Sequence, residues 1–139
     1  MTVVSLDALL DSHDGLALAD LIRRGEVSAL EILEATIARI EARDPSVNAV
    51  VHRFYDAARA ELMQGPPGGP FAGLPYLLKD LYTFQTGRPC GNGSRWLAGY
   101  RAPFDDPLVA RWREAGLVVV GKTATSEFGL NVSTESRQH

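Results

Sequence analysis

Apolar residues recur at the spacing of an α-helix through the first 64 residues of the chain. A first short helix is predicted by Leu16, Leu18, Leu21 and Ile22. Gly25 should end this helix, because glycine readily adopts the left-handed conformation. A second helix should begin with a capping box between Ser28 and Glu31 and end at Asp44-Pro45. Its buried stripe is predicted to be Leu30, Leu33, Ile37 and Ile40.

The pattern then predicts a brief strand over residues 48–51 and a third helix over residues 54–63. Phe54, Ala58 and Leu62 lie on one face of that helix. A stiff connector rich in Gly and Pro follows at residues 65–70. We therefore expect a helical layer in residues 1–64 and the first part of an α/β core in residues 65–139, together one incomplete domain.

The second half alternates between strand-like and helix-like patterns. Residues 76–78 and 117–120 are short apolar runs, and the second is typical of a strand covered on both faces. Between them, Asp106-Pro107 predicts a helix start and Gly116 a helix end. The buried side of this helix should contain Leu108, Val109 and Trp112. Strand, helix and strand in this order predict a parallel crossover unit.

The composition is that of a soluble globular protein, with 45% hydrophobic and 22% charged residues. A net charge of -3 argues against nucleic acid and anionic membranes as partners. Cys90 is the single cysteine, so no internal disulfide is possible, which fits a reducing cytoplasm. The N-terminus lacks the features of a signal peptide, and no apolar run approaches the ~18 residues of a membrane span. We expect a cytoplasmic protein.

Lys79 is the first candidate for chemistry, because it follows a strand that should be buried. A lysine that loses its hydration there favours the neutral amine, which serves as a base. The alternatives are a lysine that extends into water or one that pairs with Asp80 or another acid. Residues 85–95 form a second candidate, a glycine-rich loop whose backbone approaches a ligand closely, or else a plain surface loop.

Two other classes of site have little support. Residues 116–123 match the written pattern of a phosphate-binding loop, but Leu-Val-Val-Val favours an extended strand and a helix precedes it. Nucleotide binding through Gly121, Lys122 and Thr123 therefore stays a minor alternative. The histidines, His13, His52 and His139, lack the spacing of metal ligands, so a metal site has no support.

Four blocks of sequence together resemble the amidase signature family. They are residues 73–80, the glycine-rich loop that ends in Gly93-Ser94, residues 106–120, and residues 121–129. Their order and spacing agree with the family, and residues 69–81 are most similar to the 6-aminohexanoate cyclic-dimer hydrolase-like amidases. The implied fold is an α/β fold, the N-terminal part of the amidase signature fold, with helices covering a mixed sheet.

The resemblance implies an enzyme that hydrolyses the C–N bond of a small-molecule amide without a cofactor. In this family the catalytic groups form a Ser–cis-Ser–Lys triad, and Lys79 stands at the lysine position. Phe128, Gly129 and Leu130 match a segment that lines the acyl pocket, whereas Lys122 is interpreted as structural. Arylamide hydrolases, aliphatic amidases and aminoacyl-tRNA amidotransferases all stay open as the parent activity.

The Gly/Ser-rich segment that carries both catalytic serines in this family is absent from the 139 residues. The serines near the end of the sequence fall in other blocks: Ser94, Ser126, Ser133 and Ser136. We therefore expect a fold truncated before that segment and a chain that is inactive by itself. The alternative is a non-catalytic interaction module. An incomplete sheet exposes apolar surface, which predicts self-association or pairing with the missing C-terminal portion.

Overall fold

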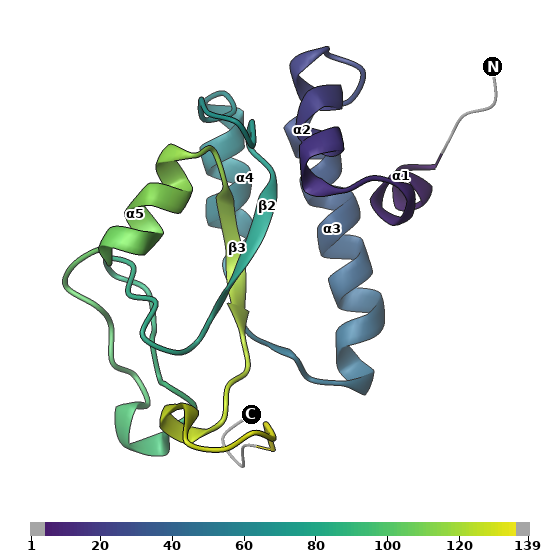
Figure 1. Cartoon of the computed structure of the whole chain (residues 1–139). Coiled ribbons are helices and arrows are strands. Elements are labelled where there is room, and N and C mark those ends of the chain that lie inside the picture. Colours follow the sequence, from purple (N-terminus) through teal and green to yellow (C-terminus); the bar gives the residue numbers. More distant parts are fainter. Residues whose placement is uncertain (1–4, 136–139) are drawn as a thin grey trace.

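A computed structural model of the chain describes residues 5–135, so the expectations for Ser136 and His139 lie outside it (Figure 1). The helices and strands are α1 (Leu6–Ser12), α2 (Gly15–Arg23), α3 (Ala29–Arg43), β1 (Val50–Arg53), α4 (Tyr55–Met63), β2 (Pro75–Lys79), α5 (Pro107–Glu114) and β3 (Val118–Thr123). None of the described helices is long and apolar enough to cross a membrane. The proposed division between residues 64 and 65 stays a prediction.

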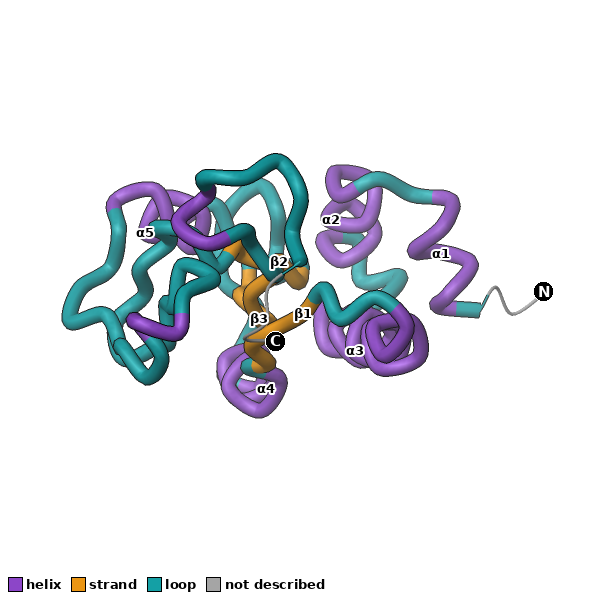
Figure 2. The backbone as a smooth tube through the Cα atoms, turned by 90° about the horizontal axis from the view of Figure 1, so that it is seen from below, coloured by secondary structure: helices purple, strands orange, loops and turns teal. Residues whose placement is uncertain are grey.

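A three-stranded sheet forms the centre of the structure, with β3 between β1 and β2. The β2 and β3 strands are parallel and are joined by α5, whereas β1 runs antiparallel to β3. Viewed from below, α4 lies against the sheet and the α1–α3 layer stands beside it (Figure 2). This arrangement confirms the predicted mixed sheet covered by helices.

An irregularity in β3 reverses the direction of its last side chains. Tyr76 of β2 pairs with Val119, but the next residue, Leu77, pairs with Gly121, so Val120 is an extra residue in β3. Such a β-bulge shifts the alternation of side chains by one. As a result Lys122 pairs with Leu78 and shares its face of the sheet, instead of the face of Val120.

The two faces of the sheet are covered by different helices. Val118 and Val120 pack with α3 and α4, while Val119 and Leu78 pack with Val109 of α5. A further cluster joins α2 and α3 to the residues directly before β2 and β3 through Leu18, Leu21, Ile32, Leu74 and Leu117. Helix α3 therefore contacts apolar neighbours on two sides, which brings Ile32 into the core together with Ala29, Leu33 and Ile37.

The predicted helix ends are confirmed. Ser28 and Glu31 form the capping box of α3, and Asp106 caps α5 by accepting a hydrogen bond from the Leu108 amide at 2.7 Å. Gly25 and Gly116 both have positive φ, as helix-ending glycines do.

Three predicted core positions are wrong: Leu16 is 60% exposed, Leu30 38% and Leu108 48%. Other members of the same stripes, such as Leu18, Leu33 and Val109, are buried, so helical spacing alone does not show where a buried face ends. The first strand is also displaced, from residues 48–51 to β1. Asp44 Oδ1 accepts hydrogen bonds from the Ala49 and Val50 amides, and Asn48 has a φ of 51°, so the turn extends further than predicted.

Replacing Gly121 should destabilise the sheet. In Gly121→Ala the new methyl group would collide with the His52 carbonyl oxygen of β1 and approach Leu77 Cδ2 to 3.2 Å. We expect the free energy of unfolding, measured by urea denaturation, to fall by about 1–3 kcal/mol, the usual cost of overpacking. Gly68→Ala is the matched control, because nothing lies within 4 Å of its added methyl group. Equal stability of the two variants would contradict the tight packing of β1 on β3.

Candidate active site

Lys79 is the last residue of β2 and lies between two buried residues. Leu78 is 1% exposed and Asp80 is fully buried, whereas the Lys79 side chain is exposed. Successive side chains of a strand point to opposite faces, so the side chain of Lys79 points away from the face of Leu78. The sequence predicts that Lys79 loses its hydration, but residues 5–135 leave its side chain exposed to water.

The buried lysine is Lys122, the other of the two lysines in the chain. Its Nζ donates a hydrogen bond to the Thr83 carbonyl at 2.8 Å and lies 3.6 Å from Asp80 Oδ1. Residues 118–123 form an extended strand, not a loop around a phosphate. The amine of Lys122 is thus engaged within the protein, and the structure gives no support to nucleotide binding at Gly121, Lys122 and Thr123.

The glycine-rich loop is packed into the protein, so it is not a plain surface loop. Residues 90–94 are all buried. The Gly91 amide donates to both carboxylate oxygens of Asp80, at 3.0 and 3.2 Å. Asn92 Oδ1 accepts from the Tyr82 amide at 2.9 Å. Gly93 approaches the backbone of Thr125 so closely that a Cβ atom would lie 2.5 Å from the Thr125 carbonyl oxygen.

The same loop positions the segment predicted to line the acyl pocket. The Phe128 amide donates to the Asn92 carbonyl at 2.8 Å, and Ser94 Oγ lies 2.6 Å from Glu127 Oε1. Gly129 packs on Leu81, two residues after Lys79, where a Cβ atom would lie 2.9 Å from Leu81 Cδ2.

Figure 1 shows these segments together at the end of the sheet where β2 and β3 finish. The structure thus brings Phe128 and Gly129 to the end of the sheet at which Lys79 finishes β2. Leu130 is exposed at the edge of this group.

Two of the described serines in this region, Ser94 and Ser126, form hydrogen bonds within or between the loops. Ser126 Oγ donates to the Asn131 carbonyl at 2.8 Å, and Ser94 Oγ also accepts from the Trp96 amide at 3.3 Å. Ser133 is exposed. In residues 5–135, no three His, Cys, Asp or Glu side chains are gathered so that they could hold a metal ion.

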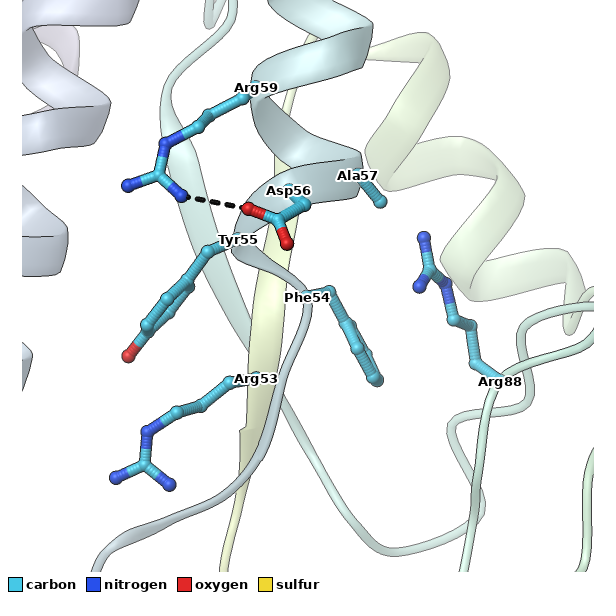
Figure 3. Close-up of a pocket in the computed structure, with 7 residues that line it drawn as sticks. All are labelled: Arg53, Phe54, Tyr55, Asp56, Ala57, Arg59 and Arg88. Carbon is cyan, nitrogen blue, oxygen red and sulfur yellow. Dashed lines mark hydrogen bonds and ion pairs between the residues drawn. The ribbon is translucent and has the colours of Figure 1, made fainter.

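The structure also contains a pocket at the start of α4 that no sequence pattern indicated. It is lined by Arg53, Phe54, Tyr55, Asp56, Ala57, Arg59 and Arg88 (Figure 3). The Arg88 guanidinium lies 4.5 Å from the centre of the Phe54 ring, a cation–π contact. Arg59 pairs with Glu34 and Asp56, so its charge is already balanced. Neither Lys79 nor residues 128–130 line this pocket.

The fold and these motifs define the class of the protein. The sequence model of the family described as Amidase matches residues 31–138, and the chain belongs to this family. It is 45% identical over 125 residues to the 6-aminohexanoate-cyclic-dimer hydrolase of Paenarthrobacter ureafaciens, a match that covers 88% of this chain and 25% of that protein. It is 44% identical over 133 residues to a glutamyl-tRNA(Gln) amidotransferase subunit of Salinispora arenicola, covering 91% of this chain and 27% of that protein.

The solved structures agree with the sequence comparison. A structure of 6-aminohexanoate cyclic dimer hydrolase superposes with a TM-score of 0.85 at 43% identity, over 96% of this chain and 27% of that one. A bacterial aryl acylamidase of the amidase signature family superposes with a TM-score of 0.78 at 32% identity, over 88% of this chain and 27% of that one. The chain therefore has the fold of one part of an amidase, and it spans about a quarter of the length of the curated relatives it matches.

The buried thiol of Cys90 should react slowly. Burial raises the pKa of this thiol, and the nearby Lys122 ammonium opposes that rise only in part. A raised pKa leaves less thiolate, the form that alkylating agents attack, at pH 8. We expect iodoacetamide to alkylate the folded chain at least about tenfold more slowly than the urea-unfolded chain, followed by mass spectrometry. Equal rates in the two states would contradict the buried position of Cys90.

Proposed function

We propose that the chain supplies the lysine-bearing part of an amidase, an enzyme that hydrolyses a carboxylic amide, and that Lys79 is the base of its Ser–cis-Ser–Lys triad. The proposal rests on one observation: in a chain of the amidase family, Lys79 is the last residue of β2, close in the chain to Leu81, on which the segment at Gly129 packs. Residues at the carboxyl end of a parallel strand pair commonly form binding sites in α/β proteins.

The proposed chemistry needs two serines from outside the described residues. The oxygen of the nucleophilic serine bonds to the amide carbon, and its proton passes through the relay serine to the neutral amine of Lys79. That proton then moves to the leaving nitrogen as the C–N bond breaks. Water then bonds to the acyl carbon and gives its proton to Lys79 through the relay serine. The acid leaves as its bond to the serine oxygen breaks and that oxygen takes the proton back. We expect residues 1–139 alone to show no amide hydrolysis.

The exposure of Lys79 bears on this mechanism. A lysine accepts a proton near neutral pH only where its ammonium form is disfavoured, which burial brings about. In residues 5–135 the Lys79 side chain is exposed, so we propose that further amidase polypeptide covers it in the working enzyme. The relatives suggest the substrate class: one acts on a cyclic dimer of 6-aminohexanoate, and one is an aryl acylamidase. A small linear, cyclic or aryl amide is the proposed substrate.

The proposal is tested in a joined enzyme, made by replacing the matched 25% of the Paenarthrobacter cyclic-dimer hydrolase with residues 1–139. Lys79→Ala should lower kcat for the cyclic dimer or for an acyl anilide by at least about 10³-fold, because it removes the base of a coupled triad. Arg111→Ala is the control, since Arg111 is an exposed cation on α5. An inactive joined enzyme, or a Lys79→Ala variant that keeps its kcat, would refute the proposal.

Exposed apolar residues support a role in association, the second candidate function. Trp96, in the short 3-10 helix Arg95–Leu97, is 87% exposed, and Leu130, directly after the 3-10 turn Glu127–Gly129, is 86% exposed. These two segments lie close together, since Ser94 Oγ is 2.6 Å from Glu127 Oε1. Uncovered aromatic and aliphatic side chains in one region typically mark an interface. We propose that this region pairs with further amidase polypeptide or, in its absence, with a second copy of the chain.

Light scattering tests this association. The chain should form species larger than a monomer, and Trp96→Ser with Leu130→Ser should reduce them by removing apolar contact area. Met63→Ser is the matched control, because Met63 is 78% exposed but lies at the end of α4. A wild-type chain that stays monomeric and monodisperse would show that these residues do not drive association.

A further inference from the structure

Asp80, the residue after Lys79, lies close to Lys122, and both of these oppositely charged side chains are fully buried. Lys122 and Asp80 are both 0% exposed, with 3.6 Å between Nζ and Oδ1. Burying two charges is costly unless additional hydrogen bonds satisfy each of them. Here the Thr83 carbonyl accepts from Lys122, and the Gly91 amide donates to Asp80. The pair is thus held by backbone contacts from two points of the segment that follows β2.

The other polar groups around the pair do not replace either partner. Burial raises the pKa of the Cys90 thiol, so Cys90 does not supply a second anion next to Lys122. The Nε2 atom of His52, on β1, lies 3.7 Å from Asp80 Oδ2. A protonated imidazole there would be a second cation beside Asp80. Lys122 and Asp80 therefore form the central ion pair of this group.

A direct chain of contacts leads from Lys122 to the backbone of Lys79. The ammonium of Lys122 binds the Thr83 carbonyl, and the Thr83 hydroxyl donates to the Lys79 carbonyl. Before Lys79, the backbone is held by the ladder between β2 and β3. After Asp80 the chain leaves the sheet, and Tyr82 takes a φ of 53°. Beyond the sheet, the hydrogen bonds of Thr83 and Asp80 hold the backbone in place.

We infer that Lys122 is a positioning residue for Lys79, acting through the Thr83 carbonyl and the Asp80 carboxylate. This inference rests on the proposed function, in which Lys79 is the base. An amine that accepts a proton from a serine must be held close to its productive position, since misplacement by about 1 Å costs on the order of 10²-fold in rate. The bulge at Val120 allows this role by turning Lys122 toward Leu78 and Asp80.

The first test removes the charge of Lys122 and keeps its length. In the joined enzyme, Lys122→Met leaves the buried Asp80 carboxylate without its cation and frees the Thr83 carbonyl. We expect kcat to fall by roughly 10- to 100-fold while KM changes by less than about threefold, because the base is displaced and the pocket is not. Rates are normalised to correctly folded enzyme. Arg111→Met, which removes an exposed cation, should leave both constants unchanged.

The second test is milder and does not disturb the buried charges. Thr83→Val keeps the carbonyl that binds Lys122 but removes the hydroxyl that donates to Lys79, whereas Thr83→Ser keeps both. We expect Thr83→Val to lower kcat by roughly three- to tenfold and Thr83→Ser to restore it. If the two hydrogen bonds of Thr83 act in series between Lys122 and Lys79, the kcat of the double variant Lys122→Met/Thr83→Val should be little lower than that of Lys122→Met alone.

The outcomes separate this inference from the proposed function. Loss of turnover in Lys79→Ala, together with a wild-type kcat in Lys122→Met or Thr83→Val, would overturn the positioning role and leave Lys79 as the base. Retained turnover in Lys79→Ala would overturn the proposed function itself. If Lys122→Met fails to fold, the Thr83→Val and Thr83→Ser pair decides, since equal kcat values in those two variants would refute the inference.

Discussion

The ion pair between Lys122 and Asp80 holds together the end of the sheet where all the candidate chemistry lies. Each partner joins the sheet to a loop: Lys122 reaches Thr83, and Asp80 reaches Gly91. A buried pair of this kind contributes little net stability by itself, but losing one partner leaves an uncompensated charge in the core. The arrangement of the loops after β2 therefore depends on both charges being present.

The glycine-rich loop connects this pair to the rest of the candidate site. Gly93 allows the loop to touch the backbone at Thr125, and the Asn92 carbonyl accepts from the Phe128 amide. The loop therefore contacts both the buried pair and the segment near Gly129, although the two lie on different parts of the chain. If Lys79 is the base, as proposed, and residues 128–130 line the acyl pocket, as predicted, this loop helps to hold the two in a common geometry.

Much of the fold could be predicted from local signals. The capping box at Ser28 and Glu31 and the N-cap at Asp106 use short-range hydrogen bonds that any tertiary structure would keep. Leu30 and Leu108 were misplaced because a helical spacing shows which residues share a face, but not which faces meet a neighbour. The family was recognisable because four motifs occur in order, and the match to residues 31–138 bears this out.

Helix α1 was not predicted from the sequence. The order of the later helices and strands, the family, and Lys79 as the candidate base do follow from the amino-acid sequence. Which lysine is buried does not. The apolar run before each lysine is similar, so both Lys79 and Lys122 follow strand-like segments. Strand pairing distinguishes them: the extra residue Val120 shifts the register of β3 on β2 and puts Lys122 on the face of the buried Leu78, while Lys79 lies exposed on the other face of β2. Burial depends on how strands pair across space, and no local pattern in one strand specifies that register.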